Sequence, residues 1–213
     1  MSIPEPHKLW LYRIVHIDNL KYLLEHGMYH RAHKNADPNY INIGDNVLIQ
    51  QRNDYNVGVN PPNGLLGEYV PFYFGPLSPM LLNIKTGYRG IKQRPQEEII
   101  YICCSVQNIL DCCEHWCFTD GHAKTAITTF YNEIKDLSKV DLPLAAQKYW
   151  RNDEADFDRM RKKQAEFLVK HHVPTNCISN IAVYNDKAHA IASKLVNDLK
   201  LGIKVHTLPR FYY

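Results

Sequence analysis

The sequence predicts an α+β fold with a central mixed or antiparallel sheet, and its apolar pattern indicates this in two ways. Short apolar or alternating stretches, typical of strands, occur together with longer segments whose apolar residues recur at helical spacing. The two kinds do not alternate strictly, as they would around a doubly wound parallel sheet. The sequence has neither a GxGxxG motif after a predicted strand nor a P-loop, so a nucleotide would have to be held in another way.

The predicted elements begin with a strand at Leu9–Val15. A helix is expected over Ile17–His26, because apolar residues recur on one face and Gly27 follows as a stop signal. The stretch from about 29 to 68 is polar and rich in Gly and Pro, and it reads as a long loop around the short apolar piece Val47–Ile49. A loop of this length in a compact domain is usually functional or mobile.

Strands are expected on both sides of a turn at Gly75-Pro76. They are Tyr69–Phe74 and Met80–Ile84, and the apolar run Glu97–Val106 predicts another strand. The remaining predicted elements are a short helix at Val106–Cys113, a helix at Ala123–Ile134, a polar stretch Asp136–Lys163 ending in a charged helical run, a strand at Ala165–Val169, a strand at Ile178–Tyr184, an amphipathic helix at Lys187–Leu199 and a strand at Ile203–His206.

Length and composition favour one ordinary domain over residues 1–213. Of these residues 45% are hydrophobic and 22% are charged, which is typical of a globular chain able to bury a core. The net charge of +3 permits an acidic partner without requiring one. The start, MSIPEPH, lacks the features of a signal peptide, and no apolar run is long enough to span a bilayer. We therefore expect a cytoplasmic protein with no membrane partner.

The six cysteines are expected to be reduced thiols in that compartment. Cys112, Cys113 and Cys117, with His115 among them, match no common zinc spacing. The sequence therefore predicts no metal site, and we interpret the cysteines as small buried apolar residues.

Glu166 is the candidate catalytic carboxylate. It stands at the start of the predicted strand that leads into the core. Gln164 and Glu166 are two residues apart, so in an extended backbone both side chains point to one side, an arrangement suited to binding a ribose diol. Spacing alone favours the simpler alternative, a solvent-facing glutamate at a strand start.

Arg52 follows the apolar piece in the long loop. Arginine is the best side chain for gripping a pyrophosphate with two hydrogen bonds, although a loop arginine is most often merely solvated. Arg13 and His16 lie where the first strand gives way to a helix. Side chains in such a place often line a cleft, and both can equally be hydrogen-bonded surface groups.

Two basic clusters suit phosphate contacts. Lys85, Arg89, Lys92 and Arg94 fall within a segment that has no acidic residue, and a solvated loop is an equal alternative. The second cluster approaches Glu166 and follows several acidic residues, so a helix of mixed charge is its simpler interpretation. It consists of Arg159, Arg161, Lys162 and Lys163.

The segment Thr119–His122 precedes a predicted helix. Asp120 is placed to cap that helix. His122 is placed either to touch a substrate or to serve as a turn residue.

Several motifs, in order along the whole chain, resemble the DarT toxins, a family of DNA ADP-ribosyltransferases paired with a macrodomain antitoxin. Each motif is weak alone, and their order makes the resemblance specific. The motifs are Leu11–Leu20, Ile43-Gly44-Asp45 with Arg52, Val70–Leu81, Phe118–Ala123, Gln164–Val169, and Lys204-Val205 with Pro209 and the aromatic tail.

The resemblance implies an ADP-ribosyltransferase-like fold with NAD as co-substrate, no metal, Glu166 as the catalytic glutamate and Arg52 as a second essential residue. The residues implied for the NAD pocket are Tyr12, Arg13, His16, Asn19, Gly44, Tyr73 and Met80. The residues expected at the DNA are Lys85, Arg89, Arg94, His122, Arg159 and Lys162. Family members often have His at the position of Arg13 and Arg at the position of Leu77, so the contacts expected there are altered.

By the same resemblance the acceptor is a base in single-stranded DNA, expected to be thymine at a ring nitrogen, and the protein is a bacterial toxin whose macrodomain antitoxin reverses or blocks the modification. A single strand spares the cost of unstacking a base from a duplex. Guanine, RNA or protein as acceptor stays open, as does a non-enzymatic module that binds single-stranded nucleic acid.

Overall fold

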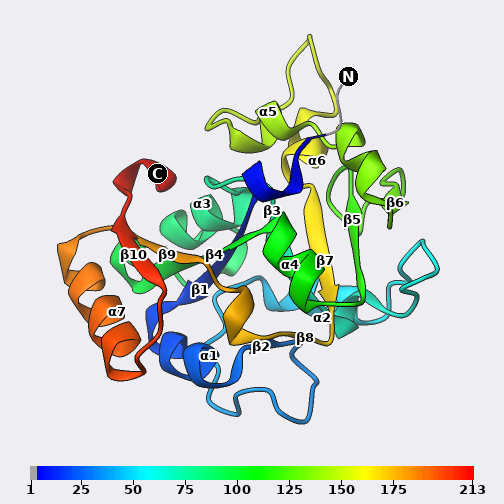
Figure 1. The fold of residues 1–213 in the computed structure, drawn as a ribbon. Coiled ribbons are helices and arrows are strands. Elements are labelled where there is room, and N and C mark those ends of the chain that lie inside the picture. Colours follow the sequence, from blue (N-terminus) through cyan, green and yellow to red (C-terminus); the bar gives the residue numbers. More distant parts are fainter. Residues whose placement is uncertain (1–3) are drawn as a thin grey trace.

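An eight-stranded mixed sheet runs through the chain in the order β10-β9-β4-β1-β3-β7-β5-β6 (Figure 1). The computed structural model describes residues 4–213. All neighbouring strands in this sheet are antiparallel except β9 and β10, which are parallel. The strands are β1 (Trp10–His16), β3 (Tyr69–Tyr73), β4 (Ile99–Ser105), β5 (Trp116–Thr119), β6 (Phe130–Tyr131), β7 (Glu166–Lys170), β9 (Asn180–Val183) and β10 (Lys204–Thr207), and a separate pair joins β2 (Met28–Tyr29) to β8 (His172–Val173).

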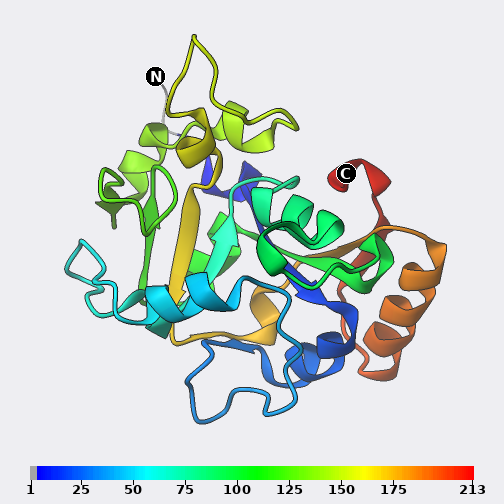
Figure 2. The same cartoon turned by 180° about the vertical axis from the view of Figure 1, so that it is seen from behind.

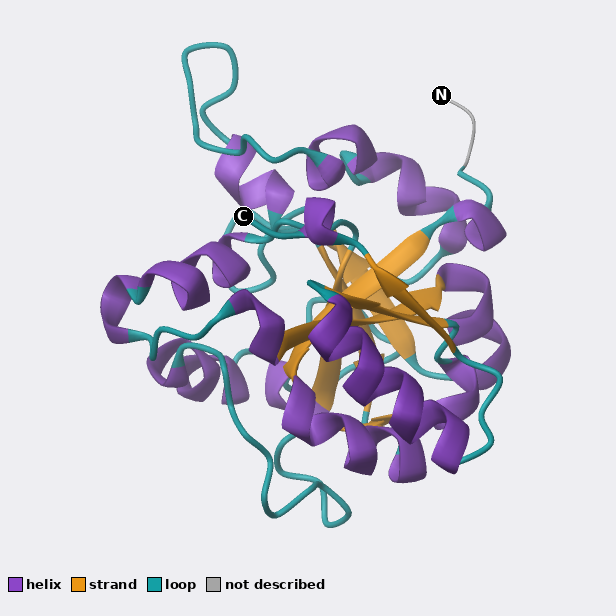
Figure 3. Ribbon diagram, turned by 90° about the vertical axis from the view of Figure 1, so that its left-hand side faces the viewer, coloured by secondary structure: helices purple, strands orange, loops and turns teal. Residues whose placement is uncertain are grey.

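Helices lie on both sides of the sheet, as the side view in Figure 3 shows. They are α1 (Leu20–His26), α2 (Asn46–Asn53), α3 (Pro79–Thr86), α4 (Val106–Cys112), α5 (Leu142–Ala146), α6 (Arg159–Lys163) and α7 (Asp186–Asp198). The α+β class expected from the sequence is confirmed. Among residues 4–213, no helix is both long and apolar enough to cross a membrane.

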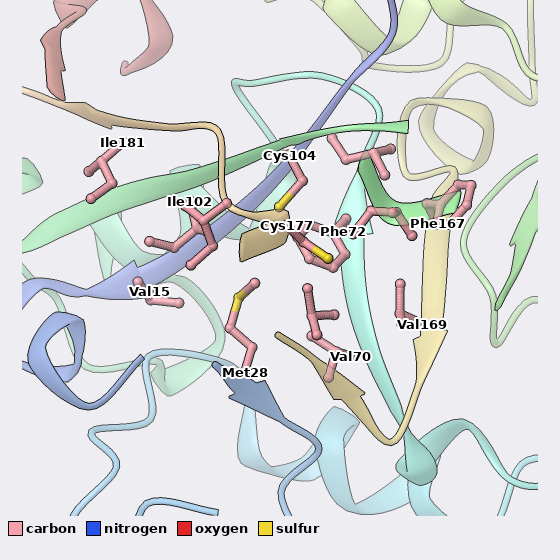
Figure 4. Packing of buried hydrophobic residues seen from close by; sticks show 14 of the residues in the cluster. Val15, Met28, Val70, Phe72, Ile102, Cys104, Phe167, Val169, Cys177 and Ile181 are labelled. Carbon is pink, nitrogen blue, oxygen red and sulfur yellow. The ribbon is translucent and has the colours of Figure 1, made fainter. Parts of the chain in front are cut away.

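The main hydrophobic core lies on one face of the sheet. It contains Phe72, Cys104 and Phe167 together with apolar residues of α1, α4 and α7 (Figure 4). Alternate residues of the same strands point to the other face, because side chains alternate along a strand. The expectation that the cysteines are buried small residues is confirmed for five of the six, all but Cys112, and all six are free thiols.

The opposite face carries two smaller apolar clusters instead of one. One cluster joins Tyr101 on β4 to α3 and Tyr212, and the other joins Leu168 on β7 to Tyr69. Figure 2 shows α2 and α3 on the near side of the sheet over this face. Polar side chains lie on the strip of the sheet between these two clusters.

The register of the strands sets a row of side chains along this strip. β1 pairs with β4 over its whole length but with β3 only at Tyr12↔Tyr73. β3 in turn pairs with β7, and Tyr73 stands opposite Glu166. Because directly paired residues point to the same face, Tyr12, Tyr73 and Glu166 lie side by side where the sheet opens between β1 and β3.

Two expected elements differ from the structure because helix caps outweigh apolar content. The predicted strand Met80–Ile84 is the helix α3, since Ser78 accepts a hydrogen bond from the backbone of Leu81, Pro79 starts the helix and Gly87 ends it in the left-handed region. The loop expected around Val47–Ile49 contains α2, capped by the Asp45 carboxylate. A short apolar run does not distinguish a strand from a buried helix.

The helix predicted for Ala123–Ile134 is also wrong. The segment forms turns and then β6, and Asp120 therefore caps no helix there. Its carboxylate accepts instead from the backbone of Thr129 and from Arg161. The prediction also missed β5, a strand of only four residues.

Gly75 tests how tightly the segment after β3 packs against α5. A Cβ at this position would overlap the carbonyl group of Ala145, so we expect Gly75→Ala to force a backbone shift and cost about 1–3 kcal/mol of the free energy of unfolding. Gly202→Ala is the matched control, because a Cβ there meets no atom within 4 Å. Equal denaturation midpoints for the two variants would contradict this packing.

Candidate active site

A buried ion pair lies at the centre of the candidate site. Glu166 is the first residue of β7 and is 3% exposed. Arg52, in the last turn of α2, donates from Nη1 to Oε1 at 2.9 Å and from Nη2 to Oε2 at 2.7 Å. This two-pronged geometry is the strongest that an arginine and a carboxylate form. It joins residues 114 positions apart in the sequence.

The loop after β5 supplies a third donor to the same carboxylate. The backbone N–H of Ala123 donates to Oε1 of Glu166 at 3.0 Å. Thr119, at the end of β5, accepts from the backbone N–H of Glu166 at 3.1 Å and donates to the carbonyl of Gly121 at 2.6 Å. Strand β5 therefore fixes the backbone of Glu166, and the loop after β5 fixes its carboxylate. Sequence reasoning did not single out Thr119 or Ala123, because only the pairing of β5 with β7 reveals their contacts.

The charge state of the site follows from these contacts. Burial disfavours an ionised Glu166, but the charge and hydrogen bonds of Arg52 outweigh it and hold the pKa of the carboxyl below its ordinary value. Burial, reinforced by the negative charge of Glu166, raises the pKa of Tyr73 to about 12. The site at neutral pH therefore contains an ionised carboxylate beside a protonated phenol.

His122 is a neutral imidazole in this site. Burial lowers its pKa, and the charge of Glu166 offsets this only in part. Its Nδ1 accepts from the backbone N–H of Lys124 at 3.3 Å, so the proton of the neutral ring belongs on Nε2. His122 thus has one N–H to donate to a bound molecule.

Arg161 holds the loop that carries His122 and Ala123. Its Nη1 donates to Asp120 at 2.9 Å and to Thr128 at 3.2 Å, and its carbonyl accepts from the backbone N–H of His122 at 3.0 Å. A Cβ on Gly121 would overlap the guanidinium, so the loop lies directly against it. Arg161 is therefore a structural support of the site.

The other basic residues of this cluster are engaged elsewhere. Arg159 pairs with Asp153 at 3.1 Å, and Lys162 pairs with Asp156 at 3.0 Å. Lys163 is buried and has backbone acceptors only, the carbonyls of Pro76 and Ala145. Burial lowers its pKa to about 8. The sequence grouped these side chains in one basic cluster with a helix of mixed charge as its simpler interpretation, and the ion pairs of Arg159, Arg161 and Lys162 agree with that interpretation.

Gln164 does not stand beside Glu166 as expected. It ends α6 with a non-extended backbone, and its amide donates to the carbonyl of Met160 at 2.9 Å. The prediction that both side chains share one side of a strand is wrong, because β7 begins only at Glu166.

The polar residues at the end of β1 bind the protein itself. Arg13 donates to the carbonyl of Pro71 on β3 at 2.9 Å, beyond the single paired position of β1 and β3. His16 is buried and contacts Glu98 at 3.3 Å. Asn19 exchanges two hydrogen bonds with the backbone of Ile41, at 2.8 and 2.9 Å, and so fixes the chain just before α2.

The first basic cluster is spread over three places. Lys85 donates to the main-chain oxygen of Tyr213 at 2.6 Å, and Arg94 pairs with Glu98 at 3.3 Å. Arg89 lines a hollow of about 260 Å³ together with Gly44 and the start of α2. Met80, on α3, is partly buried and packs against the apolar cluster around Tyr101, as Tyr12 also does.

Neither the candidate site nor any other part of residues 4–213 brings together three or more His, Cys, Asp or Glu side chains that could hold a metal ion. The side chains gathered at the candidate site are the carboxylate of Glu166, the guanidinium of Arg52, the phenol of Tyr73 and the imidazole of His122.

We expect Arg52→Ala to lower the free energy of unfolding by about 3–5 kcal/mol, because it leaves a buried charge without a partner. Adding Glu166→Gln removes that charge, so the double variant should be more stable than Arg52→Ala alone. The ionised Glu166 contributes to the free energy of unfolding in full above about pH 4.3, the ordinary pKa of Glu. This contribution is lost as the pH falls through the lower pKa that Glu166 has in the folded protein. Urea denaturation at pH 7 and at pH 3.5 measures both effects.

Lys194→Ala is the control for that experiment, because its pair with Asp198 is exposed and should matter little. If the two single substitutions at Arg52 and Glu166 simply add in the double variant, the pair is not coupled and this account of the site fails.

Comparisons with known proteins point to one family. The family model described as "ssDNA thymidine ADP-ribosyltransferase, DarT" matches residues 12–213. A DNA ADP-ribosyl transferase of Escherichia coli O127:H6 is 34% identical over 208 residues, which cover 98% of this chain and 95% of the relative. Another, of Thermus sp. strain 2.9, is 37% identical over 190 residues, covering 87% and 85%.

Solved structures are similar over the whole chain. Thermus sp. 2.9 DarT in complex with ADP-ribosylated ssDNA matches with a TM-score of 0.88 at 31% identity, covering 100% of this chain and 99% of that one. The same protein in complex with NAD+ matches with a TM-score of 0.83 at 30% identity, covering 100% of both chains. The sequence, the fold and these matches together place this chain in the DarT family of single-stranded DNA thymidine ADP-ribosyltransferases.

Proposed function

We propose that this protein transfers ADP-ribose from NAD to a thymine base in single-stranded DNA and releases nicotinamide. The observation that carries the proposal is the buried Arg52–Glu166 pair, which stands in one row with Tyr73 and Tyr12 where the sheet opens. Relatives named DNA ADP-ribosyl transferase, and a related structure bound to ADP-ribosylated ssDNA, support this substrate class.

In the first step, the bond between the ribose C1′ and the nicotinamide nitrogen breaks, and its electron pair leaves with nicotinamide. Positive charge then develops on the ribose. An ionised Glu166 stabilises that charge where it forms, and its fixed hydrogen bonds keep the carboxylate in place beforehand. In this role Glu166 must be ionised, as its lowered pKa ensures.

In the second step, a ring nitrogen of thymine bonds to C1′ and loses its proton, which passes to the Glu166 carboxylate and then to solvent. The Arg52 guanidinium beside Glu166 stabilises the negative charge that builds on the base. The Nε2–H of His122 is suited to donate to a base carbonyl. All three groups come from different elements, and the loop held by Arg161 aligns two of them.

We place NAD along the opening between β1 and β3, against Tyr12, Tyr73 and Glu166. Arg13, His16, Asn19 and Gly44 shape one end of it, mostly through the segment that Asn19 fixes. Met80 borders the same opening from α3. The residues proposed for DNA are His122, Lys85, Arg89, Arg94, Arg159 and Lys162, of which His122 has the best support because it lies within the electrostatic reach of Glu166.

The biological role we propose is that of a bacterial toxin acting in the cytoplasm, where both NAD and single-stranded DNA occur. Its partner would be an antitoxin of the macrodomain type that removes or blocks the modification. A relative in Thermosipho africanus, 28% identical over 95% of this chain, is named a DNA ADP-ribosyl transferase-DNA ADP-ribosyl glycohydrolase fusion protein. A transferase joined to a glycohydrolase, an enzyme that hydrolyses the bond to ADP-ribose, supports such a pairing.

Mass spectrometry of thymine-containing oligonucleotides after incubation with NAD tests the proposal. We expect one ADP-ribose added to the wild-type product, and a rate about 10²–10³-fold lower for Glu166→Gln, which loses the stabilising charge. Glu114→Gln, at a side chain 88% exposed, is the control and should match wild type. Modification of guanine, RNA or protein instead would reassign the acceptor, and binding of DNA without nicotinamide release would exclude an enzyme.

The loop support gives a second kinetic prediction. Arg161→Ala should lower kcat about 10–100-fold, because small displacements of positioned groups are costly, while KM for NAD changes less. Arg161→Lys should recover little, since a lysine cannot bond Asp120, Asp158 and Thr128 together. Arg31→Ala, at an exposed arginine, serves as the control. A fall in stability with an unchanged kcat would show that Arg161 supports the fold only.

A further inference from the structure

The segment between α5 and α6 carries unusual side chains for a surface loop. It projects beyond α5 in Figure 1 and approaches the C-terminal segment in Figures 1 and 2. Tyr149 is 59% exposed and Phe157 is 77% exposed, although aromatic rings of this size are normally covered. An exposed tyrosine followed by a tryptophan is typical of a surface that binds another ring.

Part of this loop borders an open hollow of about 360 Å³ on the surface. Its lining is Leu82 on α3, Lys148, Tyr149, Trp150, Arg151 and Tyr213. The walls are fixed by hydrogen bonds, because Trp150 donates from Nε1 to the hydroxyl of Tyr213 at 2.8 Å and that hydroxyl donates to the carbonyl of Leu77. The hollow is therefore built before any ligand arrives.

The hollow and the proposed active site share the segment that follows β3. Leu77, whose carbonyl accepts from Tyr213 in the wall of the hollow, lies four residues after Tyr73, which stands opposite Glu166. Lys163 ties this segment to α5 through the carbonyls of Pro76 and Ala145.

The charges at the hollow are free for a ligand. Lys148 and Arg151 are exposed and form no ion pair with any carboxylate in residues 4–213. Arg159, Arg161 and Lys162, farther along the same stretch of chain, all have acidic partners. Lys148 lies 6.0 Å above the ring of Tyr213, so the cation and the aromatic wall are adjacent.

Aromatic walls with unpaired cations beside them match the chemistry of a nucleotide in a single strand. Its base stacks on an aromatic ring, and its phosphate pairs with a lysine or arginine. We propose that this hollow is a subsite for a nucleotide of the DNA strand that flanks the modified base. The inference rests on the proposed function. It adds a second place, outside the reacting centre, at which the DNA strand is bound.

The test compares KM for oligonucleotides that keep one target thymine and differ in the number of flanking nucleotides. Tyr149→Ala should raise KM for the longer strands about 10-fold, within the range expected for loss of one stacked base, and should raise KM much less for the shortest strand. Phe157→Ala is the matched control, since Phe157 is an exposed aromatic of the same loop that does not line the hollow.

The cations give an independent readout. A double variant, Lys148→Gln with Arg151→Gln, should reduce the slope of log KM against log salt by about 1.4, because each phosphate contact with a single strand contributes roughly 0.7. Both residues are exposed, so the variant keeps its fold, which circular dichroism checks.

Three results would overturn the inference. In the first, Tyr149→Ala and Phe157→Ala have equal effects at every strand length. In the second, Tyr149→Ala raises KM for NAD instead of KM for DNA, which would assign the hollow to the co-substrate. In the third, the salt slope is unchanged in the double variant. If the wild-type protein releases nicotinamide but modifies no DNA, the proposed function itself is refuted. This outcome is detected with the wild-type protein, before any variant is compared.

Discussion

The buried pair between Arg52 and Glu166 is the interaction on which the site depends. Taking two charges out of water costs several kcal/mol for each ion, so a buried pair persists only with good geometry and further hydrogen bonds. Here both oxygens of the carboxylate are bonded by the guanidinium, and Ala123 adds a backbone donor. The pair also fixes α2 against β7 and against the loop after β5. The helix that ends at Arg52 is therefore part of the site and not only a cover over it.

The divided sheet decides where that pair can lie. β1 stays with β4 along its length and leaves β3 after a single paired position, Tyr12↔Tyr73. Apolar side chains cover this face in two separate clusters. A continuous cluster would have buried the row that ends at Glu166 under apolar atoms. Arg13 satisfies a carbonyl that the missing strand pairing leaves free, which stabilises the opening.

The cationic side chains of the protein divide into two groups with different roles. Arg52, Arg161 and Lys163 are largely buried and bonded to protein groups, so they organise the structure. Lys148 and Arg151 are exposed and unpaired within residues 4–213, so they are available to a ligand. The net charge of +3 belongs to the whole chain and does not distinguish the paired cations from the unpaired ones. Local pairing, and not the sum of charges, determines which face of the protein attracts a polyanion.

The sequence by itself determined the α+β class, most strands and the helices α1, α4 and α7, because their apolar periodicity is local and strong. Its motifs also pointed to Glu166 and Arg52. Tertiary structure alone decided that these two side chains meet across 114 residues and that Gln164 turns away. The apolar periodicity of a short segment shows only which face of that segment is buried. Which distant residue stands opposite depends on strand register, and the register is settled only when the whole sheet assembles.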